Sequence, residues 1–324
     1  MNEWLTWVPC RIDDAACERL REVGEVALGH GPTAVPWEEV AERVDAVLLR
    51  SARMDRDRIE AAPRLRIIAR HGAGYDTVDL AAARERGVAV TVTAGANAVS
   101  VAEHAFALIL SVVRRVAASD AAVRQGRWDE ARRAATGLEL SGRTLGLVGF
   151  GRIGRRVARM AAAFDMTVLA ADPVADAQAA RELGVRLVTL PALLAASDVV
   201  SLHAPLLPGT RRLIDARALA TVRRGAVLVN TSRGGLVDES ALVDALDRGI
   251  LSGAGLDVVE DEPLAPDSPL LRADITLTPH CGGQTVEAMR RVGLEAADSV
   301  LACARGMPLA VESARPVPTS GPGH

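Results

Sequence analysis

The chain has 324 residues, of which 38 are basic and 41 are acidic, so its formal charge is −3 and it carries no excess of positive charge for nucleic acid. Every basic residue is an arginine, which excludes chemistries that need lysine, such as a Schiff base or a P-loop. The length allows two domains with complete hydrophobic cores.

Cysteines and apolar segments limit the class of protein further. The four cysteines form no C-x-x-C pair, so neither a metal site nor a disulfide framework is predicted. The N-terminus has no secretory leader pattern, and the longest strongly apolar run, residues 105–113, is too short to cross a bilayer. We expect a cytoplasmic protein without a metal and without nucleic-acid or membrane partners.

Short apolar runs alternate with longer helical patterns along the chain. Continuous apolar runs are typical of strands buried on both faces of a parallel sheet. Their alternation with helices predicts an α/β fold with doubly wound parallel sheets. The predicted elements are, in order, strands at 46–50, 66–70 and 88–92, a long helix at 98–117, strands at 144–149, 166–171, 198–202, 226–230 and 254–259, and a helix near 284–305. The tail, 306–324, is rich in Pro, Gly and Ser and is expected to fray.

A glycine motif predicts a dinucleotide site. Gly149, Gly151 and Gly154 form G-x-G-x-x-G directly after the strand at 144–149 and before a helix. Such glycines allow a tight turn, close approach of a pyrophosphate and close packing of helix on strand. Asp172 ends the next strand, where a carboxylate accepts from ribose hydroxyls and repels a 2′-phosphate, although it could also simply cap the following segment. We therefore predict NAD rather than NADP.

Three residues near strand ends suggest hydride transfer to a 2-oxo acid. His280 suits proton transfer to a carbonyl oxygen, Glu262 suits a partner that fixes the imidazole, and Arg233 suits a ligand for a carboxylate. Taken singly, Arg233 is better interpreted as a surface cation and the acidic run 260–263 as a solvated turn. Their occurrence together, after a nucleotide motif, favours catalysis.

Residues 45–300 resemble the D-isomer-specific 2-hydroxyacid dehydrogenases. The resemblance lies in GFGRIG and in the segments 202–214, 229–239, 253–263 and 278–283. It implies that Arg233, Glu262 and His280 are catalytic. It also implies that the following residues line the cofactor site: Gly149, Gly151, Arg152, Ile153, Gly154, Asp172, His203, Pro205, Thr231, Asp257 and Gly282, with Asp257 accepting from the nicotinamide carboxamide.

The same resemblance implies an interrupted architecture. A flavodoxin-like substrate domain, residues 1–97 and 287–324, would contain an inserted NAD-binding Rossmann domain, residues 98–286. Family members commonly form homodimers through the cofactor domain. The pattern is most similar to 3-phosphoglycerate dehydrogenase-like members, and no C-terminal regulatory module is expected in a chain that stops at 324.

Substrate contacts are predicted in the N-terminal part. The segment 70–79 resembles the loop that grips the substrate carboxylate with main-chain N–H groups, here those of Ala73 and Gly74. Arg50 and Arg70 match positions that are basic in 3-phosphoglycerate dehydrogenases and could bind a phosphate or phosphonate, or could be ordinary surface arginines. Two further residues, Ser51 and His71, are expected near the substrate.

Three functions remain open on the sequence. The first is an NAD-dependent dehydrogenase for a small anionic 2-hydroxy acid, with or without a phosphate. The second is a glyoxylate or hydroxypyruvate reductase. The third, from another class, is an NAD-sensing transcriptional corepressor, because the same fold serves binding proteins too.

Overall fold

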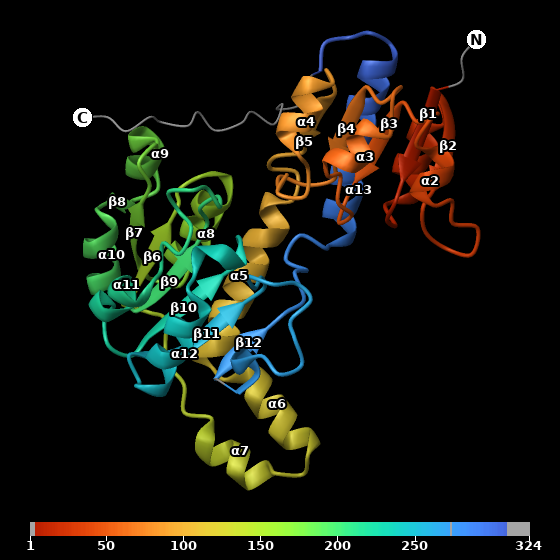
Figure 1. Cartoon of the computed structure of the whole chain (residues 1–324). Coiled ribbons are helices and arrows are strands. Elements are labelled where there is room, and N and C mark those ends of the chain that lie inside the picture. Colours follow the sequence, from red (N-terminus) through yellow and green to blue (C-terminus); the bar gives the residue numbers. More distant parts are fainter. Residues whose placement is uncertain (1–3, 273, 310–324) are drawn as a thin grey trace. The chain divides into compact units, whose positions relative to one another are not determined.

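The computed structural model describes residues 4–272 and 274–309 (Figure 1). The chain divides into two compact units, unit 1 with residues 1–97 and 284–324 and unit 2 with residues 98–283. The sequence predicted the second boundary at 286/287. Most of the predicted fraying tail, residues 310–324, lies outside the described residues. Among the described helices, none combines the length and hydropathy of a membrane span.

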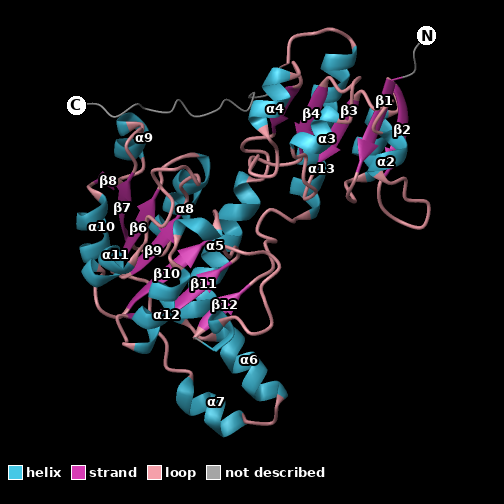
Figure 2. Cartoon of the chain, viewed as in Figure 1, coloured by secondary structure: helices cyan, strands magenta, loops and turns pink. Residues whose placement is uncertain are grey.

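Unit 1 is a five-stranded parallel sheet with helices on both faces (Figure 2). Its order, β2-β1-β3-β4-β5, is that of flavodoxin-like folds. Helix α13, which follows unit 2 in the sequence, packs beside α1 and against β4, so it covers one face of the sheet built by the N-terminal residues. The elements are β1 Trp4–Val8, α1 Asp14–Leu20, β2 Gly24–Leu28, α2 Trp37–Val40, β3 Ala46–Leu49, α3 Arg56–Glu60, β4 Ile67–Arg70, α4 Leu80–Glu85, β5 Ala89–Val92 and α13 Val286–Ala304.

Unit 2 is a seven-stranded parallel sheet of order β12-β11-β10-β9-β6-β7-β8. Read from β8, the order is that of a Rossmann fold with one strand added at its edge. The helices are α5 Ala98–Val113, α6 Val116–Arg124, α7 Trp128–Ala134, α8 Arg152–Ala162, α9 Ala177–Glu182, α10 Leu190–Ala196, α11 Ala216–Thr221 and α12 Glu239–Asp247, with 3-10 turns Gly234–Leu236 and Pro269–Arg272. The strands are β6 Thr144–Val148, β7 Thr167–Ala171, β8 Arg186–Leu187, β9 Val199–Leu202, β10 Ala226–Asn230, β11 Leu251–Leu256 and β12 Ile275–Leu277.

The sheets are buried on both faces, which explains their continuous apolar runs. Strands β3, β4, β9 and β10 are buried at every position. In each unit, separate apolar clusters cover the two faces of the sheet. The fold class predicted from the sequence is therefore confirmed.

The predicted helix at 98–117 is wrong in one respect, because it is two helices. α5 ends at Val113, and α6 begins at Val116 after Arg115, whose φ of 53° is left-handed. Figure 1 shows α6 and α7 side by side at one end of unit 2. The strand expected at 254–259 also lies earlier, at Leu251–Leu256, because the chain turns at the buried Asp257.

Close packing of α5 on β11 depends on two glycines. A Cβ on Gly253 would lie 2.8 Å from Val112 Cγ1, and one on Gly255 would lie 3.1 Å from Leu108 Cβ. Residues 104, 108 and 112 lie on one face of a helix because they are four residues apart. The face of α5 that carries His104 is thereby held against β11.

Candidate active site

The three predicted catalytic residues follow three neighbouring strands of unit 2. Arg233 lies after β10, Glu262 after β11 and His280 after β12, and these strands are adjacent in the sheet. Parallel strands present their carboxyl ends at one edge, which is where ligands bind in open α/β sheets. The sheet order thus supports a common site at this edge of unit 2.

Glu262 and His280 form a direct pair. His280 Nδ1 lies 2.8 Å from Glu262 Oε2, and the side chains are 50% and 39% exposed. A hydrogen bond at Nδ1 fixes the ring and directs Nε2 away from the carboxylate. This is the arrangement of a histidine that exchanges a proton with a ligand while a carboxylate stabilises its charged form.

His280 has a left-handed backbone, with φ of 50°. This conformation costs roughly 1–2 kcal/mol for a residue with a side chain. The main-chain N–H of His280 donates to the carbonyl oxygen of Asp257 at 2.8 Å, which helps to hold it there. Strain of this kind is often found at functional sites.

The turn that carries Arg233 is fixed by its neighbours. The Asn230 side chain donates to the Arg233 carbonyl at 2.8 Å and accepts from the Ser232 N–H at 3.0 Å. A Cβ on Gly234 would lie 1.9 Å from the carbonyl carbon of Val259. The turn after β10 therefore packs directly on the segment that leads to Glu262.

Asp257 is a buried carboxylate at the centre of this edge. Its Oδ1 accepts from the Thr278 hydroxyl at 2.6 Å and the Cys281 N–H at 2.9 Å, and its Oδ2 accepts from the Gly282 N–H at 2.8 Å. Burial alone raises the pKa of Asp257, but hydrogen bonds from His104, Thr278 and the two amides outweigh burial and lower the pKa to about 2. Asp257 is therefore ionised at any working pH.

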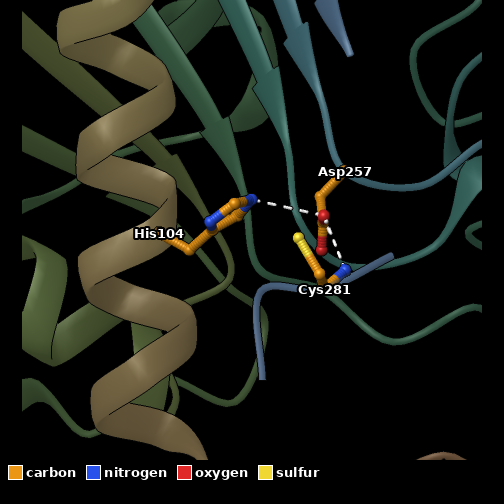
Figure 3. Close-up of side chains that lie close together, drawn as sticks. All are labelled: His104, Asp257 and Cys281. Atoms are coloured by element: carbon orange, nitrogen blue, oxygen red, sulfur yellow. Dashed lines mark hydrogen bonds and ion pairs between the residues drawn. The ribbon is translucent and has the colours of Figure 1, made fainter. Parts of the chain in front are cut away.

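His104, Asp257 and Cys281 lie together in Figure 3, with His104 on α5. One potential metal-ligand atom from each lies within 4.8 Å of the other two. The Asp257 oxygen that faces His104 already accepts two strong hydrogen bonds, however. Burial, and secondly the charge of Asp257, raise the pKa of the Cys281 thiol, which keeps it protonated. The hydrogen bonds of Asp257 are thus sufficient to explain why these three side chains lie together.

The glycine motif has the geometry of a dinucleotide turn. Gly149 has φ of 98°, and a Cβ there would lie 2.5 Å from the His203 carbonyl oxygen. A Cβ on Gly154 would lie 2.4 Å from the Gly149 carbonyl oxygen, whereas one on Gly151 would meet nothing within 4 Å. The two outer glycines serve packing, and the middle one leaves space at the start of α8, whose first two residues are Arg152 and Ile153.

Asp172 lies beside this turn. Its Oδ2 accepts from the Phe150 N–H at 2.8 Å and its Oδ1 from the Val174 N–H at 2.9 Å. It therefore both holds the glycine turn and caps the segment that follows β7. Each oxygen retains acceptor capacity for a ribose hydroxyl.

Two predicted cofactor positions carry buried polar atoms that have no hydrogen-bond partner among the described residues. His203 and Thr231 follow β9 and β10, and within the described part of the chain neither His203 Nδ1 nor Thr231 Oγ1 has a hydrogen-bond partner. Burial lowers the pKa of His203 to about 4, so this ring is neutral at pH 7. Pro205 follows in the same loop, and its carbonyl accepts from Thr210 Oγ1 at 2.7 Å. Buried orphan atoms and the open space at Gly151 fit a dinucleotide.

The predicted substrate residues other than Arg233 belong to unit 1. Arg50 and Ser51 follow β3, and the loop with Ala73 and Gly74 follows β4, a neighbour of β3 in the sheet. Arg50 donates to the Arg11 carbonyl at 3.2 Å. The exposed Ala73 and the half-buried Gly74 lie in the loop that was predicted to bind a carboxylate.

Arg70 and His71, both predicted near the substrate, make contacts within unit 1. Arg70 is buried, and its guanidinium donates to the carbonyl oxygens of Gly74 at 2.7 Å, Arg50 at 2.9 Å and Leu49 at 3.2 Å. His71 is also buried, and its Nε2 lies 3.3 Å from the Met289 carbonyl on α13. Both side chains thus stabilise unit 1, and binding of a phosphate by Arg50 and Arg70 stays a prediction.

The sequence did not point to three polar neighbours of these sites. Cys10 Sγ lies 3.1 Å from Ser51 Oγ in unit 1, and in unit 2 His104 and Thr278 contact Asp257. His104 had a usable signal, since it shares the apolar face of a helix with Leu108 and Val112. Cys10 and Thr278 had none, because their partners lie far away along the chain.

Known proteins match this chain over most of its length. Residues 106–282 match the model of the D-isomer specific 2-hydroxyacid dehydrogenase NAD binding domain. Glyoxylate reductase of Korarchaeum cryptofilum is 40% identical over 307 residues, which cover 93% of this chain and 92% of that protein. The chain belongs to the D-isomer-specific 2-hydroxyacid dehydrogenase family. The predicted family is thereby confirmed.

Other members of the family differ in length. D-3-phosphoglycerate dehydrogenase of Archaeoglobus fulgidus is 38% identical over 301 residues, which are 92% of this chain and 57% of that protein. The chain spans about half the length of the curated D-3-phosphoglycerate dehydrogenases it matches first. The crystal structure of the TT0316 protein from Thermus thermophilus has a TM-score of 0.86 and 39% identity, and the match covers 95% of this chain and 99% of that one.

Proposed function

We propose that this member of the 2-hydroxyacid dehydrogenase family is an NAD-dependent enzyme that interconverts a small 2-oxo acid and its 2-hydroxy acid. The observation that carries the proposal is the hydrogen bond of 2.8 Å between His280 and Glu262. Glu262 follows β11, which is the neighbour in the sheet of β10, the strand that leads to Arg233. A proton donor, a group that stabilises its charge and a carboxylate ligand are what reduction of a 2-oxo acid requires.

Each residue has a separate task in this mechanism. NADH, when bound, supplies the hydride that is transferred to C2. His280 delivers the proton to the carbonyl oxygen from Nε2 and recovers it in the reverse direction. Glu262 holds Nδ1 and stabilises the imidazolium, while Arg233 binds the substrate carboxylate.

We propose that unit 2 is the cofactor domain, inserted in unit 1, which is the substrate domain. Supporting this assignment, the glycine turn and Asp172 belong to unit 2. Ala73 and Gly74, which are predicted to bind the substrate carboxylate, belong to unit 1. We further propose a homodimer through unit 2. Val116, Val123 and Trp128 on α6 and α7 are 55%, 41% and 64% exposed, which is unusual for large apolar side chains and suits an interface. Light scattering would show a dimer.

The proposed substrate carries a single carboxylate and no phosphate, as glyoxylate and hydroxypyruvate do. Arg70, which would have completed a second anion site, is buried against three carbonyl oxygens. A phosphorylated substrate is the second candidate, because Arg50 lies at the end of β3 and several relatives are D-3-phosphoglycerate dehydrogenases.

The test is oxidation of NADH, followed at 340 nm, with glyoxylate, hydroxypyruvate and 3-phosphohydroxypyruvate. Higher kcat/KM on the first two, with little change in Arg50→Ala, supports the proposal. Preference for the phosphorylated acid, lost selectively in Arg50→Ala, supports the second candidate. If NADH binds but no acid is reduced, the dehydrogenase proposal is wrong and an NAD sensor becomes the better explanation.

A further inference from the structure

Asp257 holds the loop that carries His280 through several hydrogen bonds. Three successive main-chain N–H groups, those of residues 280, 281 and 282, donate to Asp257, the first to its carbonyl oxygen and the others to its carboxylate. Successive N–H groups beside a left-handed residue form a concave anion site. The carboxylate of Asp257 therefore stabilises the left-handed conformation of His280.

A second link runs from Asp257 through Thr278 to helix α5. The Thr278 hydroxyl has one proton, which it donates to Asp257 Oδ1 at 2.6 Å. His104 Nε2 lies 2.9 Å from the same hydroxyl oxygen, so it must be the donor in that contact. His104 Nε2 therefore carries a proton, and it also lies 3.2 Å from Asp257 Oδ1.

The packing of α5 on β11 brings His104 to this network of hydrogen bonds. Gly253 and Gly255 allow α5 to lie close to β11, and His104 continues the face formed by Leu108 and Val112. Gly282 is constrained as well, since a Cβ there would lie 2.9 Å from Asp257 Oδ2 and 3.2 Å from His104 Cδ2. The His104 side chain and Gly282 therefore pack closely around the Asp257 carboxylate and restrict its orientation.

We propose that His104, acting through Thr278 and Asp257, is a positioning residue that holds the His280 loop in its working conformation. The inference rests on the proposed function, because it assigns His104 to the proton-transfer step. It explains why a polar residue occupies the buried face of an apolar helix. A carboxylate that has lost one donor would have a wider choice of orientations, and the amides of Cys281 and Gly282 would follow it.

The experiment compares matched pairs in the full-length protein. Thr278→Val removes the hydroxyl at nearly constant volume, and Thr278→Ser keeps it. Likewise His104→Leu removes the donor, and His104→Gln keeps an N–H at similar reach. Glu103→Gln, an exposed change on the same helix, serves as the background control. The readouts are kcat, the dissociation constant of NADH and hydrogen exchange of the amides at 280–282.

For Thr278→Val and His104→Leu we expect kcat to fall about 10- to 100-fold, as for loss of a hydrogen bond to a charged group. Amide exchange at 281 and 282 should accelerate. NADH affinity should fall by a smaller factor than kcat, because the glycine turn is untouched although Asp257 and Gly282 belong to the predicted cofactor site. Thr278→Ser and His104→Gln should recover most of both losses. The inference would be overturned if kcat and amide exchange were unchanged in Thr278→Val and His104→Leu. It would also be overturned if Thr278→Ser and His104→Gln lost as much kcat as these two variants.

The two proposals fail in different ways. If the wild-type protein reduces no 2-oxo acid, the proposed function fails, yet the exchange rates still decide whether His104 and Thr278 hold the loop. If the wild-type protein is active and exchange at 281 and 282 does not respond to Thr278→Val, only the positioning role fails.

Discussion

Replacing Gly234 by alanine tests whether the Arg233 turn and the segment before Glu262 form one rigid unit. An ideal Cβ at residue 234 lies 1.9 Å from the Val259 carbonyl carbon and 2.3 Å from the Glu260 nitrogen, both main-chain atoms. Real Cβ contacts stay beyond 3.0 Å, so one segment must move by at least 3.0 − 1.9 = 1.1 Å. Overpacking of this kind costs about 1–3 kcal/mol, or roughly 3–10 °C in Tm.

The same displacement should impair catalysis, because a shift of about 1 Å in a catalytic group can cost on the order of 100-fold in rate. Gly235→Ala is the matched control, since its Cβ would meet only side-chain atoms, the nearest being Leu206 Cδ2 at 3.1 Å, and a side chain can rotate away. The assays are thermal unfolding and kcat/KM for both variants. Equal behaviour of the two, or a Gly234→Ala protein with wild-type Tm and activity, would refute the reasoning.

Two further changes probe the cofactor site and unit 1. Asp172→Ala should weaken NADH binding and narrow the preference for NADH over NADPH, with both dissociation constants measured by fluorescence titration. An unchanged ratio of the two dissociation constants would remove Asp172 from ribose recognition. Burial lowers the pKa of His71 to about 4 from 6.5, so the unfolded chain binds a proton that the folded chain refuses. The contribution of His71 to the free energy of unfolding should therefore be complete above pH 6.5. It should fall by on the order of 3 kcal/mol as the pH drops to about 4. Thermal unfolding against pH should show a shallower fall in His71→Gln, and an identical slope would contradict this assignment.

Local patterns were sufficient for most of the fold and for the centre of the candidate site. The continuous apolar runs marked β3, β4, β6, β7, β9 and β10 because both faces of these strands are buried. The glycine motif and the pair of Glu262 and His280 were visible because their chemistry needs fixed residue types. By contrast, β8 has two exposed residues and no apolar pattern that could have revealed it.

Interactions between distant segments were the part that the sequence could not supply. Arg70 matched a predicted anion ligand, and the carbonyl oxygens to which it donates are brought near it only by the fold. The end of α5 depends on the left-handed backbone of Arg115, for which arginine gives no signal. The contact of His104 with Asp257 spans 153 residues of chain and follows from the packing of α5 on β11.

The most direct test of the central claim is the turnover of His280→Ala with the best 2-oxo acid of the panel. The proposed mechanism predicts that NADH binds with nearly unchanged affinity, because the glycine turn lies on another part of the sheet, while kcat falls about 10²–10⁴-fold. Turnover close to that of the wild-type protein would contradict proton transfer by His280 and with it the assignment of this edge of unit 2 as the active site.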